Sequence, residues 1–218
     1  MNAHPLLHEN KNAIVTCIIF LVTFILFSIA KTNYFQPIDN AANLWVVHLH
    51  TDTVTLIAKS ISIAFDTIAL AIASLVVAGF LFIKKHKDQS LLLLTAVGGN
   101  ALFVLIIKTL TQVPRPVNHL LDGSGYSYPS GHSSGAVIFI GLLVYFVWLN
   151  WNNSKYAKIW SSTLFGLVVA LVSFDRIYLN VHWLSDVVGG CLFGAFWLPF
   201  CIIVYEQLKI TNKFSRFK

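Results

Sequence analysis

The segment Ser90–Leu110 reads SLLLLTAVGGNALFVLIIKTL and carries a single charged residue, Lys108, near its end. Its length is close to the roughly 20 apolar residues that an α-helix needs to cross about 30 Å of hydrocarbon. It lacks the regular alternation of a barrel strand, and a backbone surrounded by lipid must satisfy its own hydrogen bonds. The segment is therefore predicted to be a transmembrane α-helix.

Five further apolar segments of similar length flank it. They are Asn12–Ala30, Ser60–Ile83, Ser133–Asn150, Ile159–Leu179 and Asp186–Tyr205. The whole chain of 218 residues is 56% hydrophobic and only 11% charged, with a mean hydropathy of +0.72, which excludes a disordered chain and an ordinary soluble domain. We predict an all-α polytopic membrane protein, with six transmembrane helices in one bundle. Because no repeat or linker interrupts it, we expect residues 1–218 to form a single domain.

The basic residues predict how the bundle is oriented. With the N-terminus inside, ten of the 15 Lys and Arg residues fall on the cytoplasmic side, and five fall outside or at outer helix ends. Both termini are therefore predicted to be cytoplasmic. The net charge of +6 then reflects topology, and no nucleic-acid partner is expected. A cleaved signal peptide is the less favoured interpretation of the first segment, because its apolar run is long and Glu9 opposes Lys11 before it.

Residues 31–59 are less apolar than the segments on either side. They show a partial amphipathic pattern, which predicts a short helix at the outer interface. This helix could be a lid over a site or a passive connector. The residues of the pattern are Ile38, Leu44, Trp45, Val47 and Leu49.

Cationic residues gather where the outer ends of the later helices are expected to meet. Lys108, Arg115 and Arg176 would form an anion site, and the arginine forks suit phosphate oxygens. Ser130-Gly131-His132 opens the fourth segment, where free N–H groups and the positive end of the helix dipole favour a phosphate. These residues therefore predict a phosphate-binding pocket.

Two histidines could supply the chemistry at this pocket. His182 and Asp186 are spaced i, i+4, and a carboxylate bonded to one imidazole nitrogen makes the other nitrogen more nucleophilic. His132 is a second imidazole, suited to proton transfer near neutral pH. The pattern favours phosphoester hydrolysis. A metal site is not expected, because three cations in the same pocket would repel a divalent ion.

These residues also carry a family resemblance. Lys108-x6-Arg115-Pro116, Pro129-Ser130-Gly131-His132 and Arg176-x5-His182-x3-Asp186 resemble the three signature motifs of the type 2 phosphatidic acid phosphatase superfamily. That superfamily comprises integral-membrane lipid phosphatases and their haloperoxidase relatives. The motif region is 108–186, and the six-helix layout extends the similarity over the chain.

The resemblance implies a role for each matching residue. His182 would be the nucleophile and form a phosphohistidine, Asp186 would orient it, and His132 would protonate the leaving group. The phosphoryl oxygens would be held by Lys108, Arg115, Ser130, Gly131 and Arg176. Lipid phosphatases of this kind need no metal, and no cofactor is expected for this chain. With both termini inside, the predicted topology places these residues at the outer face of the cell membrane. The chain's small size resembles bacterial members that act on undecaprenyl pyrophosphate or phosphatidylglycerol phosphate.

One position departs from the family pattern. The third motif usually begins Ser-Arg, and here it is Asp175-Arg176. The serine normally helps to bind phosphate, whereas an aspartate facing the phosphate would repel it. We expect Asp175 to point away, braced against Arg176.

Other features have structural explanations. Asp66 and Asn100 are polar residues within apolar segments, and partnering across helices explains them better than function does. Gly190-x3-Gly194 signals close helix packing, within the bundle or between protomers. The three cysteines lie in apolar runs without metal-ligand spacing.

Undecaprenyl pyrophosphate is the first substrate expected, followed by phosphatidylglycerol phosphate and phosphatidic acid. A lipid phosphotransferase would use the same site with an alcohol in place of water. A transporter of anions or lipids is a non-enzymatic alternative, although the chain shows no repeat. A catalytically inactive relative is the last alternative, which the intact His132, His182 and Asp186 disfavour. The pattern leaves the oligomeric state open.

Overall fold

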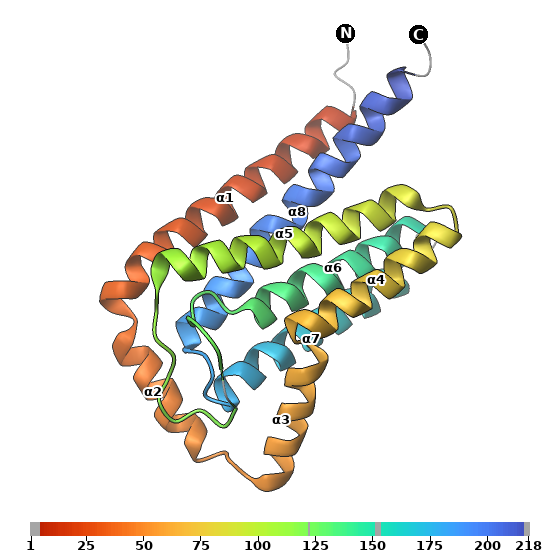
Figure 1. Cartoon of the computed structure of the whole chain (residues 1–218). Helices are drawn as coiled ribbons and strands as arrows, with labels where there is room; N and C mark the ends of the chain where they lie inside the picture. Colours follow the sequence, from red (N-terminus) through yellow and green to blue (C-terminus); the bar gives the residue numbers. More distant parts are fainter. Residues whose placement is uncertain (1–4, 122, 151–153, 216–218) are drawn as a thin grey trace.

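The computed structural model of the chain describes residues 5–121, 123–150 and 154–215. Within these residues it has eight helices and no β-strand (Figure 1), as the all-α prediction requires. The first four helices are α1 (Pro5–Tyr34), α2 (Gln36–Val47), α3 (Asp52–Ala64) and α4 (Thr67–Ile83). The last four are α5 (Lys87–Thr111), α6 (Gly131–Asn150), α7 (Lys155–Tyr178) and α8 (Leu184–Ser215).

Among the described residues, five helices are long and apolar enough to cross a membrane: α1, α5, α6, α7 and α8. The bent pair α3 and α4 makes a sixth span if it is taken as one. Many large apolar side chains on these helices point outward, Leu26 and Leu110 among them, as lipid-facing residues do. The chain is therefore a multi-span membrane protein.

The second predicted segment, Ser60–Ile83, is not one continuous helix. The chain bends by 53° between α3 and α4. Asp66 is the N-cap of α4, and its Oδ1 accepts a hydrogen bond of 2.9 Å from the Ile68 N–H. An aspartate at this position satisfies a free N–H of a new helix, so it starts α4 rather than continuing α3. Asp66 therefore has a structural role at the start of α4, and its charge also acts on Arg176 of α7, which is an interaction across helices as expected.

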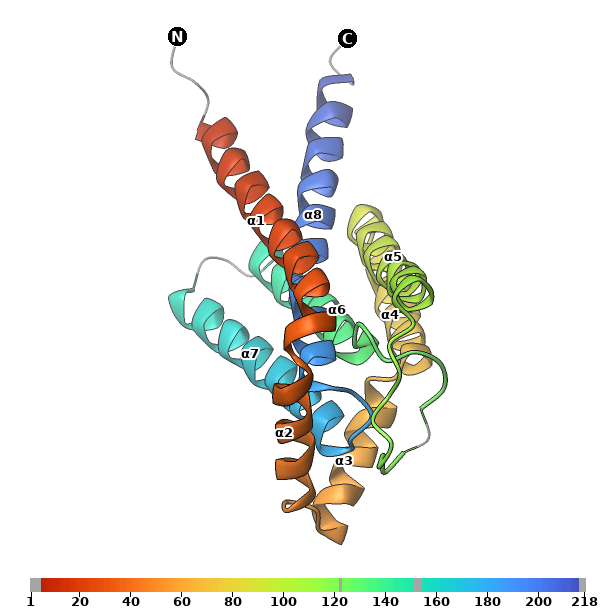
Figure 2. The same ribbon diagram turned by 90° about the vertical axis from the view of Figure 1, so that its left-hand side faces the viewer.

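The segment after α1 forms α2 and then α3, which lie beyond one end of the bundle in both views (Figures 1 and 2). The predicted amphipathic pattern of α2 is present, with Leu44 and Trp45 exposed on one face. The opposite face buries Asp39, Asn43 and Val46. Because α2 packs against α7 and α8 through this face, it is more than a passive connector.

The bundle core forms around α6, which packs against α4, α5, α7 and α8. Its central contacts join Ile138 and Leu142 to Leu93 of α5. Close approach of α8 depends on small residues: a Cβ at Gly194 would lie 2.8 Å from Val137 Cβ. Gly190 likewise faces the Ser130 carbonyl, too close for a side chain. The predicted close-packing pair thus operates within the bundle, between α6 and α8.

The two ends of the bundle differ in the residues that they carry. α1 begins and α8 ends at one end, near the α4–α5 connection (Figure 1). The predicted site residues lie at the other end, where α5 and α7 finish and α6 and α8 begin. This arrangement is consistent with both termini lying on the same side of the membrane. That this side is the cytoplasmic one remains a prediction.

Candidate active site

The His182–Asp186 pair sits where the chain enters α8. The last helix starts at Leu184, two residues earlier than predicted, so His182 lies just before the helix and Asp186 in its first turn. Asp186 Oδ2 accepts a 2.9 Å hydrogen bond from the Trp183 N–H and lies 3.4 Å from His182 Nδ1. The carboxylate therefore accepts a hydrogen bond from a backbone N–H at the start of the helix, and it also orients the imidazole.

His182 is almost fully buried, with 3% of its surface exposed. Burial lowers its pKa to about 4, and the positive charges of Lys108 and Arg115 act in the same direction, while Asp186 opposes them. The imidazole is therefore neutral at pH 7 and begins to protonate only in acid. With Nδ1 directed at Asp186, the other ring nitrogen, Nε2, faces Arg115 Nη1 at 3.4 Å.

The loop 112–130 brings Arg115 to His182. Arg115 Nη1 donates to the Val181 carbonyl at 2.7 Å, and Nε donates to the Gly125 carbonyl at 3.2 Å. Lys108 Nζ donates to the Tyr126 carbonyl at 2.7 Å, so the end of α5 reaches the same loop. The pKa of Arg115 is lowered, mainly by burial and also by the nearby Arg176. Cations from three parts of the chain thus share one site, as an anion pocket requires.

The start of α6 joins the pair from the other side. Ser130 is fully buried, and its N–H donates to the Asp186 carbonyl at 2.9 Å. Its Oγ accepts from the Ser133 N–H at 3.3 Å, which caps α6. Gly131 and His132 then open the helix. The Gly131 and His132 N–H groups lie in the first turn of α6, where the positive end of the helix dipole favours an anion.

His132 Nε2 lies 3.2 Å from the Ser62 carbonyl of α3, so the bent α3–α4 segment positions this imidazole. His132 is also within electrostatic range of His182, Arg176 and Lys108. The two histidines therefore belong to one charged cluster, with α3 behind His132 and α8 behind His182.

Asp175 and Arg176 form a buried ion pair, as expected from the sequence. Arg176 Nε donates to Asp175 Oδ2 at 2.9 Å, and Nη2 donates to the same oxygen. Asp175 Oδ1 is buried without a hydrogen-bond partner. The Arg176 guanidinium thus donates hydrogen bonds to a carboxylate at the position where the family motif usually has a serine.

Three further residues of the site escaped the sequence reasoning. Lys31 of α1 forms an ion pair with Asp186, and Ser185 hydrogen-bonds both to Lys31 and to Asp39 of α2. In the sequence, Lys31 is one of the five cations that fall outside or at outer helix ends. Its one sequence signal is a charge at the end of an otherwise apolar run, and Asp39 belongs to no motif.

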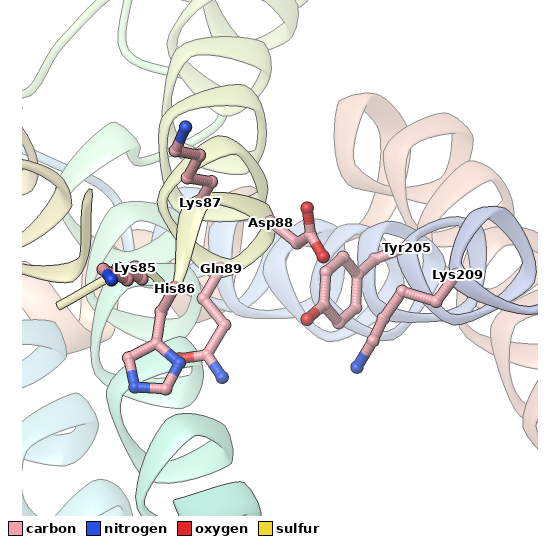
Figure 3. Close-up of a pocket in the computed structure, with 7 residues that line it drawn as sticks. All are labelled: Lys85, His86, Lys87, Asp88, Gln89, Tyr205 and Lys209. Carbon is pink, nitrogen blue, oxygen red and sulfur yellow. The ribbon is translucent and has the colours of Figure 1, made fainter. Parts of the chain in front are cut away.

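A cavity of about 290 Å³ lies at the opposite end of the bundle, away from these residues (Figure 3). It is lined by basic and polar side chains at the α4–α5 connection and on α8, at a position typical of topology-setting charges. Its lining residues are Lys85, His86, Lys87, Asp88, Gln89, Tyr205 and Lys209. Within residues 5–121, 123–150 and 154–215, no group of three or more His, Cys, Asp or Glu could hold a metal ion.

Known families and proteins include clear relatives of this chain. The model of the PAP2 superfamily matches residues 89–210. Phosphatidylglycerophosphatase B of Bacillus subtilis is 28% identical over 202 residues, which cover 92% of this chain and 96% of that protein. An undecaprenyl-diphosphatase of Sulfolobus acidocaldarius is 35% identical over 119 residues, covering 52% of this chain and 47% of that protein.

A solved structure shares the architecture as well. The crystal structure of a transmembrane PAP2-type phosphatidylglycerolphosphate phosphatase from Bacillus subtilis superposes with a TM-score of 0.80 at 26% identity. The superposition covers 89% of this chain and 97% of that one. The similarity therefore extends well beyond the motif region 108–186.

Proposed function

This chain belongs to the PAP2 superfamily, and on that premise we propose that it is a membrane lipid phosphatase. It removes phosphate from a phosphomonoester or pyrophosphate of a lipid. The observation that carries the proposal is the buried, neutral His182, held by Asp186 on one ring nitrogen and facing Arg115 with the other. A nucleophile and the cations of an anion pocket thus lie next to each other.

In the first step, His182 Nε2 attacks the phosphorus and forms a P–N bond. The P–O bond to the leaving group breaks, and His132, which enters this step protonated, gives its proton to the departing oxygen. In the second step, a water molecule attacks the phosphohistidine while His132 accepts its proton. The P–N bond breaks, inorganic phosphate leaves, and both imidazoles return to their starting states.

The remaining site residues stabilise the phosphoryl group. Its charge is spread over three oxygens in the transition state, where fixed donors act most strongly. Lys108, Arg115 and Arg176 supply positive charge, and Ser130 with Gly131 supplies the start of α6. Asp186 stabilises the ring of His182 as it becomes cationic. No step needs a metal or another cofactor.

The substrate is a lipid that reaches the site from within the bilayer. Undecaprenyl pyrophosphate is the first candidate, because the proposed site faces outward on the cell membrane. Phosphatidylglycerol phosphate is the second candidate, supported by the relative that is similar over nearly its whole length. Phosphatidic acid is the third.

The test is phosphate release by the purified protein in detergent with EDTA present. The three lipids are assayed in parallel, and the ranking identifies the substrate. His182→Ala is expected to abolish release, whereas His86→Ala, at the far end of the bundle, is expected to leave it unchanged. An added alcohol acceptor that captured the phosphate would identify a phosphotransferase instead. Phosphate release that persisted in His182→Ala would contradict the assignment of His182 as the nucleophile.

A further inference from the structure

Lys31 is a cation buried beside the proposed nucleophile, from a helix that carries no signature motif. It has 7% of its surface exposed and lies near the end of α1. Its ammonium donates to Asp186 Oδ1, forming an ion pair, and to Ser185 Oγ at 2.9 Å. It also lies over the ring of Tyr128, 4.7 Å from its centroid. A buried lysine with this many contacts is held in one place.

The contacts continue from Ser185 to α2. Ser185 Oγ donates to Asp39 Oδ2 at 2.6 Å, and the Ser185 N–H donates to Asp39 Oδ1 at 2.8 Å. Asp39 is 5% exposed and Ser185 only 1%. The serine hydroxyl therefore accepts from Lys31 and donates to Asp39, which joins α1, α2 and the start of α8 in one network.

Both oxygens of Asp186 are consequently occupied. Oδ1 is bound by Lys31, while Oδ2 is shared by the Trp183 N–H and His182 Nδ1. A carboxylate held at both oxygens cannot turn away from the imidazole that it orients. We propose that Lys31, supported by Ser185 and Asp39, is a positioning residue that fixes the Asp186 carboxylate against His182. The inference rests on the proposed function, since it assigns a role in the same reaction.

Lys31 also acts on the charge balance around His182. With Lys31 present, the negative charge of Asp186 is partly neutralised. Without it, His182 would become the nearest partner of a buried anion, and its protonated form would be stabilised. The other charged or titratable groups that act on this ring are Asp186 of α8, Lys108 of α5, His132 of α6 and Arg115 of the loop.

The direction of the effect follows. Loss of Lys31 raises the pKa of His182 from about 4. A larger fraction of the nucleophile is then protonated in mild acid, so the acid limb of the rate profile moves to higher pH. A purely structural ion pair between α1 and α8 would lower thermal stability without moving this limb.

The test is Lys31→Met, measured with the lipid that the wild type hydrolyses best. Because small misplacement of a reacting group is costly, kcat is expected to fall about ten- to a hundredfold. KM should change less than about threefold, because Lys31 does not belong to the anion pocket that binds the substrate in the ground state and the transition state alike. The acid limb should rise by about one pH unit. The substrate ionises in the same way in assays of the wild type and of Lys31→Met, so it does not contribute to the difference between their pH profiles.

Three variants complete the series. Lys31→Arg keeps the cation and is expected to restore most of kcat and the wild-type acid limb. Ser185→Ala keeps both charges and removes only the bridging hydroxyl, so it remains informative if Lys31→Met fails to fold. It should lower kcat severalfold at unchanged KM. Lys84→Met, an exposed cation at the other end of the bundle, is the matched control and should behave as wild type.

A turnover-independent measurement separates this inference from the proposed function. The ring nitrogens of His182 are titrated by ¹⁵N NMR in the wild type and in Lys31→Arg, Ser185→Ala and, if it folds, Lys31→Met. Loss of the cation in Lys31→Met should move the titration to higher pH even in an enzyme that hydrolyses no tested lipid, whereas Lys31→Arg and Ser185→Ala, which keep both charges, should titrate like the wild type. Wild-type kcat in Ser185→Ala, or either a wild-type kcat or a wild-type titration of His182 in folded Lys31→Met, would overturn the positioning role. An inactive wild type would instead count against the phosphatase assignment alone.

Discussion

At the scale of single residues, the site depends on how a few buried charges are shared. Arg176 gives two of its donors to Asp175, whereas Arg115 gives its donors to loop carbonyls and to His182. A phosphate must compete with these partners for the same guanidinium groups. Asp175 is therefore the residue whose replacement should change anion binding most directly.

Replacing Asp175 by serine is expected to free Arg176 for the phosphate and to supply a hydroxyl donor. Breaking the buried pair leaves Arg176 uncompensated, which costs about 3 kcal/mol of stability. We therefore expect Asp175→Ser to have a lower melting temperature than the wild type without ligand. Orthovanadate should stabilise the variant more than the wild type, with a three- to tenfold lower dissociation constant. Thermal unfolding over a vanadate series measures both effects.

Asp175→Asn serves as the control, because its amide oxygen can still accept from Arg176 although the charge is gone. It should fall between the wild type and the serine variant. Equal vanadate affinity in all three proteins would show that Arg176 takes no part in binding the phosphoryl oxygens.

At the scale of elements, the site depends on how closely α8 approaches α6. Gly190 and Gly194 let α8 lie against Ser130, Ser134 and Val137, so the Ser130 N–H can reach the Asp186 carbonyl. The same contact sets the distance between the helix start that binds phosphate and the pair that attacks it. Packing of two helices thus fixes the geometry of the chemistry.

A methyl group at position 194 tests this contact. Its carbon would lie 2.8 Å from Val137 Cβ and 3.2 Å from the Ser134 carbonyl oxygen, so Gly194→Ala should lose about 1–3 kcal/mol of stability by overpacking. Gly166 in α7 has no atom within 4 Å of such a methyl group. Gly166→Ala should therefore be neutral or slightly stabilising, as expected for alanine in a helix.

Thermal unfolding in detergent compares the two variants, and phosphate release follows the site. Gly194→Ala is expected to lose activity along with stability. A pair of variants with the same melting temperature would mean that α8 can move away from α6 without cost.

At the scale of the whole molecule, the proposed catalytic groups and the cations around them lie at one end of the bundle, and exposed lysines lie at the other. Lys85 and Lys87 at this far end line the cavity of Figure 3, and Lys84 precedes them in the chain. Positive charges of this kind favour the cytoplasmic side. The charge distribution therefore predicts that the active site opens on the outer face.

Labelling in intact cells tests this orientation. In a variant whose three cysteines are replaced, Ser124→Cys lies in the exposed loop beside Arg115, and Lys87→Cys lies at the start of α5. A membrane-impermeant maleimide should label position 124 in whole cells, and position 87 only after lysis. The reverse pattern would place the site in the cytoplasm and remove the preference for an outward-facing substrate. Phosphate release by both variants confirms that they are folded.

The sequence by itself determined the helical membrane fold and the eight motif residues. Spans of about 20 apolar residues can be only helices or barrel strands in lipid, and the strand pattern is missing. The motifs are local in sequence and carry their chemistry in residue type and spacing, so His132, His182 and Asp186 could be proposed as site residues without coordinates. The pairing of Asp175 with Arg176 also followed, because neighbouring opposite charges in an apolar setting bind each other.

Only the tertiary structure decided which residues from outside the motifs join the site. Lys31 and Asp39 lie more than a hundred residues from Asp186, and their contacts exist because α1 and α2 pack against α8. The break at Asp66 was likewise hidden inside an apolar run, and it brings the Ser62 carbonyl to His132. Hydropathy reports only that a helix prefers lipid. Which face meets which neighbour depends on packing between distant segments, and that packing places a buried lysine beside a carboxylate.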